Sequence, residues 1–239
     1  MIYTESYQVR WHDTDFNLIA TPSALLTFMQ ETANHHLDSM GMPLDEIRDT
    51  RGVGFILSKL AMQVYAPLHA YDKIDVETWV GDDRGFRFHR AFRILRDNET
   101  IAEALTVWGL IRLSDHSLVR VEDFDAPFQP EALPEMKIPA RIRFPLDPLL
   151  DRGTRTVRYS DADYNEHMNN TRYPNMLCDF LPDMHGKFLT SINLSYVNEA
   201  QLGETLHGYA RQDGDVWYVR TVRENGDTNA EARITLTDL

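Results

Sequence analysis

Residues 157–165 read VRYSDADYN and repeat, 148 positions later, the VRWHDTDFN of residues 9–17. Two further pairs of segments match in the same order: KLAMQVYAP at 59–67 with SINLSYVNE at 191–199, and TIAEALTV at 100–107 with TNAEARIT at 228–235. Their offsets shrink to 132 and 128, which predicts a shorter helix and tighter turns in the second copy. Three ordered matches indicate an internal duplication.

Each copy has the pattern of strand, helix and four strands. Residues 2–10 alternate as a strand does, and Thr21-Pro22 marks a helix start, because Thr is a favoured N-cap and Pro is favoured at the first helical position. Apolar residues then recur at helical spacing as far as Gly41. Strand-like segments follow at 55–65, 73–80, 86–95 and 100–113. We therefore predict an α+β fold of two tandem units, each an antiparallel sheet wrapped around a long central helix.

The segment between the copies is rich in proline. Six of the eleven prolines of the chain lie between Pro127 and Pro148, where strand-like alternation also stops. Proline at this density opposes both a helix and a central strand. We predict a first unit at residues 1–120, a surface linker at 121–150 and a second unit at 151–239.

Composition excludes several classes of protein. A net charge of -13 over 239 residues argues against nucleic acid and anionic membranes as partners. No apolar run approaches the roughly 20 residues of a membrane span, and the first residues lack the features of a signal peptide. Cys178 is the only cysteine, and the nine histidines show no H-E-x-x-H spacing. We expect a cytoplasmic protein without a metal site or membrane insertion.

Polar side chains gather directly before the second predicted helix. Asp163, Asn165 and His167 stand at every second position, so in an extended segment they would line one wall of a site. Asn169 and Asn170 follow, and Asn is a favoured N-cap. Free backbone N–H groups at such a helix start could bind a developing negative charge.

The duplication serves as an internal control on these residues. His167 stands opposite Ile19 of the first copy, and Glu199 stands opposite Pro67, so folding alone does not require either side chain. The other two residues, Asp163 and Asn165, recur in the first copy as Asp15 and Asn17. A structural role in shaping the turn therefore stays open for Asp163 and Asn165, and any catalytic site belongs to the second copy.

With these residues the chain resembles the acyl-acyl-carrier-protein (acyl-ACP) thioesterases of plants and bacteria, which consist of two fused hotdog units. The motif D-x-N-x-H-x-N-N-x-x-Y is matched by Asp163, Asn165, His167, Asn169, Asn170 and Tyr173. The family also carries a Glu followed by Cys, matched here by Glu199 but followed by Ala200. The resemblance implies hydrolysis of a fatty acyl thioester on acyl carrier protein, without a cofactor.

Thioester hydrolysis needs an activated water and donors for the tetrahedral oxyanion. We predict that His167 and Glu199 share the acid/base work and that Asp163 orients its neighbours or polarises the water. The predicted oxyanion donors are Asn165 and the amides near Asn169 and Asn170. Cys178 has apolar neighbours in the second helix, so a buried thiol with little thiolate character is expected and water attacks directly.

Acyl carrier protein is acidic, so docking it to this acidic chain needs a local basic surface. Between Lys137 and Arg172 there are seven Lys or Arg against five Asp or Glu. The candidates for docking are Arg141, Arg143, Arg152, Arg155, Arg158 and Arg172, although ordinary solvated arginines remain an alternative for each. The acyl pocket is expected in the first unit, near Met29, Leu57 and Trp108. A homodimer is one option for assembly.

Three other functions share this fold. An acyl-CoA thioesterase differs only in the carrier of the acyl group, and a hotdog hydratase or dehydratase also pairs a histidine with a carboxylate. The Asn-Asn pair after the arm and the distant Glu199 favour the thioesterase. A non-catalytic acyl-thioester sensor would carry a DNA-binding appendage, for which the two copies leave no residues.

Overall fold

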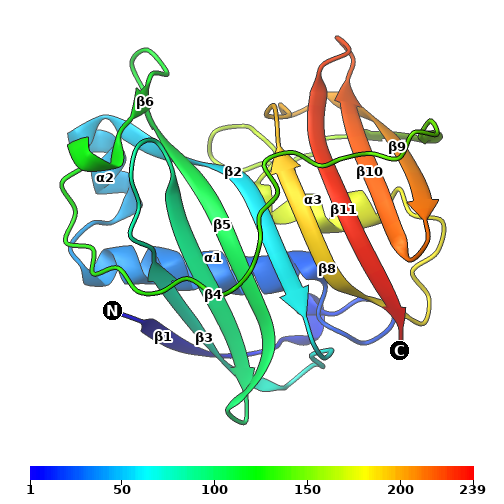
Figure 1. The fold of residues 1–239 in the computed structure, drawn as a ribbon, viewed down its shortest axis with the longest axis horizontal. Coiled ribbons are helices and arrows are strands. Elements are labelled where there is room, and N and C mark those ends of the chain that lie inside the picture. The colour runs from blue at the N-terminus through cyan, green and yellow to red at the C-terminus, as the bar shows by residue number, and fades with distance from the viewer.

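The computed structural model describes residues Met1–Leu239 and contains one antiparallel sheet of eleven strands. Ten strands follow in the order β1-β3-β4-β5-β2-β8-β11-β10-β9-β7, and β6 pairs only with β5 (Figure 1). Each predicted strand end of the first unit lies within two residues of its observed position. The strands are β1 Tyr3–Gln8, β2 Val53–Val64, β3 Lys73–Val80, β4 Phe88–Arg96, β5 Glu99–Arg112, β6 Leu118–Val119, β7 Leu150–Thr156, β8 Lys187–Tyr196, β9 Thr205–Asp213, β10 Val216–Arg223 and β11 Thr228–Asp238.

The helices α1 (Pro22–Ser39) and α3 (Tyr173–Cys178) lie on one face of the sheet. Helix α2 (Leu44–Arg51) lies near β6 (Figure 1). Short 3₁₀ helices occupy Trp11–Asp13, Val121–Asp123 and Asn170–Arg172. The predicted N-cap of α1 is confirmed, because the Thr21 hydroxyl accepts the Ala24 N–H at 3.1 Å. No helix is long and apolar enough to cross a membrane.

A pseudo-twofold relation joins the two units at the β2–β8 pair. Ala61 lies opposite Asn193, its own counterpart at the offset of 132. The isolated bridges repeat as well: Thr14–Ala20 corresponds to Ala162–Met168, and Ile19–His69 corresponds to His167–Gln201. Pairs of residues related by the offsets of 148 and 132 thus occupy equivalent positions. The structure confirms the duplication and the fold of two tandem hotdog units.

The two units share one hydrophobic core. A cluster of 35 buried residues extends from side chains of the first unit, such as Met29 and Phe92, to side chains of the second, such as Met176 and Ile192. Burying an apolar side chain of this size stabilises a fold by about 1.5–3 kcal/mol. The shared core therefore fixes the second unit's turn at residues 161–169 relative to α1.

Two features of the helices differ from the prediction. The second unit has no long central helix, because α3 has six residues and ends at Cys178, shortly before Pro182. Helix α2 was not predicted, since LDEIRDTR buries only Ile47 and shows no apolar repeat. It ends at Gly52 with φ 62°, a left-handed conformation that favours glycine.

Residues 124–149 cross the outer face of the sheet, opposite α1 (Figure 1). The Trp79 Nε1–H donates to the Ala132 carbonyl at 3.0 Å, and the Lys59 ammonium donates to the Pro139 carbonyl at 2.9 Å. At the far end the Arg211 guanidinium pairs with Asp147 at 2.7 Å. This segment is fastened to strands of both units.

Candidate active site

The stretch from Asp161 to Asn169 forms a closed turn. The Asp163 carboxylate accepts the Asn165 N–H at 2.8 Å, and the Asp163 N–H donates to the His167 carbonyl at 2.9 Å. Glu166 has φ 60° and donates to the Asp163 carbonyl. The predicted extended arm is therefore wrong, because an Asp side chain can capture the N–H two residues ahead and close a turn locally.

The turn places His167 next to Glu199. His167 Nδ1 lies 3.0 Å from Glu199 Oε2, with the imidazole side chain 30% and the carboxylate side chain 64% exposed. The Met168 N–H donates to the Ala200 carbonyl at 2.8 Å, which holds the turn against the segment that follows β8. Asp163 and Asn165 make no side-chain hydrogen bond to this pair, so the structure brings together two of the four predicted catalytic residues.

Asn169 is confirmed as a cap at the start of the second helical segment. Its Oδ1 accepts the Thr171 N–H at 2.9 Å and the Thr171 hydroxyl at 2.8 Å. The Asn169 N–H itself donates to the Asp161 carbonyl, so it is already occupied. Asn170 N–H has no hydrogen bond. Of these three backbone amides, Asn170 is the one free to bind an anion.

Sequence reasoning missed Asn229, which holds the Glu199 segment in place. This fully buried side chain donates to the Asn198 carbonyl at 2.6 Å and to the Tyr173 hydroxyl at 3.1 Å, and it accepts from the Thr221 hydroxyl at 2.8 Å. Its backbone carbonyl accepts the Asn198 N–H. A signal was present in the repeat, because TNAEARIT places Asn229 where TIAEALTV has Ile101.

The six predicted docking arginines do not form one surface. Arg155 pairs with Asp161 at 2.8 Å and Asp179 at 3.3 Å, which neutralises it, and the Arg152 guanidinium lies over the Trp217 ring. Four exposed arginines have no ion pair. Two of them lie on the segment that crosses the outer face, and two lie close in sequence to the Asp161–Asn169 turn: Arg141 and Arg143, and Arg158 and Arg172.

The expected acyl-pocket residues are also dispersed. Met29 belongs to the main core, whereas Trp108 packs against a second cluster, formed by Met42, Ile47, Val53, Phe88, Leu110, Val119 and Phe124. Leu57 is buried but belongs to neither cluster. The prediction that these three residues line one pocket is not supported by a shared cluster.

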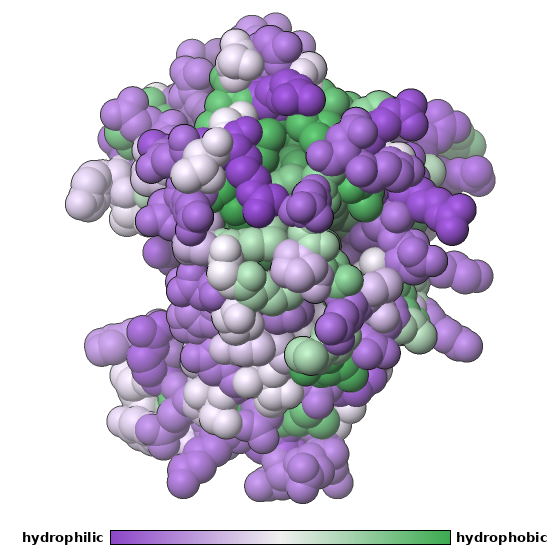
Figure 2. Space-filling model, turned by 90° about the vertical axis from the view of Figure 1, so that its left-hand side faces the viewer, coloured by the Kyte–Doolittle hydropathy of each residue, from purple (hydrophilic) through white to green (hydrophobic).

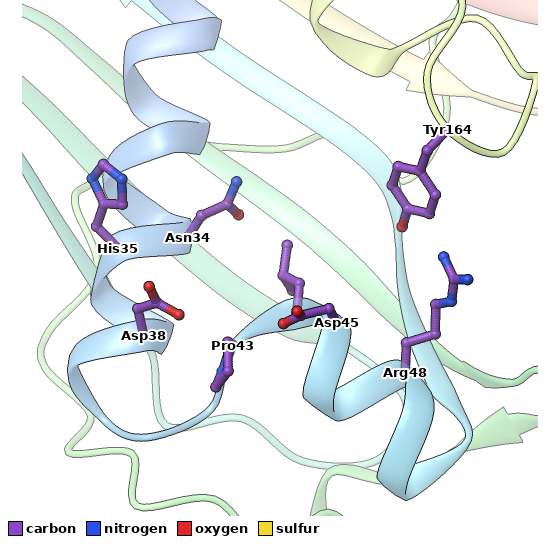
Figure 3. A pocket seen from close by; sticks show the side chains of 8 residues that line it. Asn34, His35, Asp38, Pro43, Asp45, Arg48 and Tyr164 are labelled. Atoms are coloured by element: carbon purple, nitrogen blue, oxygen red, sulfur yellow. The ribbon is translucent and has the colours of Figure 1, made fainter.

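A cavity of about 380 Å³ opens where Tyr164 of the Asp161–Asn169 turn meets the first unit (Figure 3). The Tyr164 ring projects from the turn, and the Arg48 guanidinium carbon lies 5.3 Å from its centroid. The cavity is lined by Asn34, His35, Asp38, Pro43, Leu44, Asp45, Arg48 and Tyr164. Figure 2 shows the side of the molecule that carries α2 as largely hydrophilic, with an apolar area near its upper end.

Other reactive groups do not add to the site. Cys178 is partly buried at the end of α3, and burial raises the pKa of its thiol to about 12. The thiol is thus protonated and a poor nucleophile. No group of three or more His, Cys, Asp or Glu side chains is arranged to hold a metal ion.

Solved structures share the whole fold. An acyl-ACP thioesterase from Bacteroides thetaiotaomicron superposes with a TM-score of 0.88, at 22% identity, over 99% of this chain and 98% of that one. The 12:0-ACP thioesterase from Umbellularia californica gives a TM-score of 0.82, at 16% identity, over 100% and 98% of the two chains.

Curated plant relatives match at the level of sequence. The chloroplastic palmitoyl-acyl carrier protein thioesterase of Arabidopsis thaliana is 22% identical over 100% of this chain, which spans 61% of that relative's length. The chloroplastic oleoyl-acyl carrier protein thioesterase of Coriandrum sativum is 23% identical over 97% of this chain and 69% of its own length. Residues 1–126 match the acyl-ACP thioesterase N-terminal domain, and residues 151–238 match the C-terminal domain. The chain belongs to the acyl-ACP thioesterase family.

Proposed function

We propose that this protein hydrolyses fatty acyl thioesters of acyl carrier protein to free fatty acid and carrier protein. The observation that supports this function is the 3.0 Å contact between His167 Nδ1, which belongs to the family's motif, and Glu199 Oε2. The test is to incubate the protein with acyl thioesters of acyl carrier protein, coenzyme A and pantetheine and to measure released thiol. No release from any thioester would contradict the proposal.

In the proposed mechanism His167 is the general base. With its Nδ1–H donating to Glu199, the Nε2 atom is left to accept a proton from water. The activated water attacks the thioester carbonyl carbon, and the carbonyl oxygen takes the negative charge. The C–S bond then breaks as the imidazolium returns its proton to sulfur. General-base assistance of this kind contributes about 10²–10⁴-fold.

The oxyanion requires hydrogen-bond donors. Two are available near His167: the side-chain amide of Asn165, which has no hydrogen bond, and the free N–H of Asn170. One donor of this kind is worth roughly 10²–10³-fold in turnover. Asp163 acts on the turn itself through the Asn165 N–H, so its proposed role is to hold the turn in shape.

A covalent route through cysteine is not part of the proposal. The residue after Glu199 is Ala200, which has no nucleophile, and the protonated Cys178 thiol lies at the far end of α3. Water is therefore the proposed nucleophile.

A hydratase or dehydratase is the second candidate, since a histidine paired with a carboxylate also serves that chemistry. It predicts a change in enoyl absorbance without thiol release, so the two assays on one acyl thioester separate the candidates. Choice between carrier protein and coenzyme A follows from kcat/KM for the two thioesters.

The carrier protein is the proposed partner, docked through one of two unpaired pairs: Arg158 and Arg172 beside the Asp161–Asn169 turn, or Arg141 and Arg143 on the outer face. An acidic carrier is attracted by such cations even where the whole chain is acidic, because screening limits the field of distant charges. We further propose the cytoplasm as location and leave a homodimer as the alternative to a monomer, to be decided by sedimentation.

A further inference from the structure

A band of buried polar side chains crosses the inner face of the first unit's sheet. Along β4, Arg90 separates Phe88 from Phe92, and along β5, the paired Thr106 separates Leu110 from Ala104. The outer members of these rows belong to different apolar clusters. We call the buried residues between the clusters the polar band: His36 of α1, Thr78, Arg90 and Thr106.

The band contains a cation without a counter-charge. Arg90 is 7% exposed, and its guanidinium has no carboxylate within ion-pair distance. Its Nη1 contacts the Thr78 hydroxyl at 3.3 Å and His36 Nδ1 at 3.1 Å. Burial lowers the pKa of His36 to about 4, so this partner is neutral at pH 7. Burying an unpaired charge is costly, which makes the arrangement unusual for a purely structural core.

Part of the guanidinium remains available. Both hydrogen bonds of Arg90 use Nη1, and none uses Nε or Nη2. The N–H groups of Nε and Nη2 therefore have no acceptor within the fold. A planar guanidinium with two such donors matches an oxygen acceptor, above all a carboxylate.

The second unit shows that the fold does not require this band. Strand β10 of the second unit has a β-bulge after Thr221, and β4 of the first unit has one after Ile94. Aligning the two strands at these bulges places Trp217 at the position of Arg90. By the offsets of the flanking strands, Thr78 corresponds to Ala210 and Thr106 to Ile234. The residues of the second unit that are equivalent to the polar band are therefore apolar.

We propose that the polar band receives an oxygen-bearing far end of the acyl chain, with Arg90 as a specificity-determining residue. This inference rests on the proposed thioesterase function. Helix α1 lies between the two places: Asn34, His35 and Asp38 line the cavity beside Tyr164 on one face of the helix, and His36 on its opposite, buried face belongs to the band. An acyl chain that enters at the catalytic turn and runs beneath α1 meets Arg90, where a hydroxyl or carboxylate replaces the missing acceptor.

The test compares acyl thioesters of equal length on one carrier, with a methyl, hydroxyl or carboxylate group at the far end. In the wild type, kcat/KM for the oxygen-bearing chains should exceed that for the methyl chain. Arg90→Met should lower this ratio at least about tenfold, because a charge-assisted hydrogen bond is lost. Arg93→Met is the matched control: it lies on the same strand, pairs with Glu77 and Glu103, and should leave the ratio unchanged.

A folding defect in Arg90→Met would be detected by circular dichroism, and Thr78→Val, which removes the hydroxyl that contacts Arg90 Nη1, then replaces it, with a smaller fall in the same ratio expected. If no thioester is hydrolysed, the thioesterase proposal fails, and the band is tested by binding instead. Dicarboxylic acids should then bind the wild type more tightly than monocarboxylic acids of equal length, and Arg90→Met should remove the difference. A wild-type preference for methyl ends, or a ratio that is the same in wild type and variants, would overturn the inference.

Discussion

The two turns that precede the helices have the same backbone and opposite surroundings. In both, an Asp accepts the N–H of an Asn two residues later: Asp15 from Asn17 at 2.7 Å, and Asp163 from Asn165 at 2.8 Å. Both also contain a residue of positive φ, Leu18 and Glu166. The shared part of the motif therefore serves the shape of the turn.

The side chains of the first turn are locked into its neighbours. The Asn17 amide donates to the carbonyls of Met184 and Lys187 at 2.7 and 3.0 Å and accepts the Gly186 N–H at 2.9 Å. Next to it, Phe16 stacks on His185 with ring centroids 4.3 Å apart. Asn17 is thus held by hydrogen bonds to the segment at residues 184–187, and the counterpart of His167 is the buried, apolar Ile19.

The second turn lacks these hydrogen bonds to neighbouring segments. Asn165 is exposed and its side chain has no hydrogen bond, while Tyr164, the counterpart of Phe16, borders a cavity. The extra helix α2 faces this turn where the second unit has only a short loop after α3. One of two equivalent positions has thus become structural, and the other is free for chemistry.

The largest effect is expected at the residue that distinguishes the turns. His167→Ala should lower kcat by about 10²–10⁴-fold without loss of folding, because it removes the proposed base. His185→Ala is the matched control, since this exposed histidine also contacts a carboxylate, Asp183, at 2.8 Å. Steady-state thiol release measures both variants. Near-normal turnover of His167→Ala would sink the assignment.

Next in size is the contrast between the two asparagines. Asn165→Ala should lower kcat about 10²-fold if its amide stabilises the oxyanion, with an unchanged free energy of unfolding. Asn17→Ala should do the reverse, lowering the free energy of unfolding by about 1–3 kcal/mol while kcat stays the same. Urea denaturation and thiol release measure the pair. Equal effects of both changes would mean that the turns are not differentiated.

A smaller loss is expected from the residue that positions Glu199. Asn229→Asp keeps the shape but cannot donate to the Tyr173 hydroxyl and the Asn198 carbonyl, so the Glu199 segment loosens and kcat should fall about tenfold. The free energy of unfolding should also fall, because each lost buried bond costs about 1–3 kcal/mol. The KM should barely move. Asn225→Asp, on an exposed turn, is the control. A change confined to KM would contradict a positioning role.

Charge reversal should have a modest effect on carrier binding. Arg158→Glu with Arg172→Glu, beside the catalytic turn, should raise KM for the carrier-protein thioester a few-fold, and added salt should reduce the difference. The pair Arg141→Glu and Arg143→Glu tests the outer face in the same way. A pantetheine thioester should be insensitive to both pairs. Equal losses on both substrates would indicate structural roles.

The smallest effect concerns the thiol. Cys178→Ala should keep wild-type turnover, because burial raises the pKa of Cys178 to about 12 and no thiolate forms near pH 7. Labelling with iodoacetamide at pH 8 should be slow in the folded protein. Mass-spectrometric detection of an acyl group on Cys178 during turnover would overturn attack by water.

The duplication made His167 and Glu199 predictable, because each opposes a residue that cannot transfer protons. The same reasoning reaches Asn229 through Ile101. It could not reveal that Asp163 closes a turn, since alternating residues are compatible with both a strand and a local side-chain hydrogen bond. Nor could it locate Arg90, whose environment depends on three strands and α1 coming together. Strand positions followed from alternation, whereas the polar helix α2 carried no such signal.

The continuous sheet through β2 and β8 has a consequence for how the protein behaves on dilution. In a pair of separate hotdog subunits, the contact between the halves would be governed by mass action and lost at low concentration. Here the halves are one chain with a shared core, so each holds the other at a fixed, high effective concentration. Contact between the Asp161–Asn169 turn and the first unit should therefore persist however dilute the protein becomes.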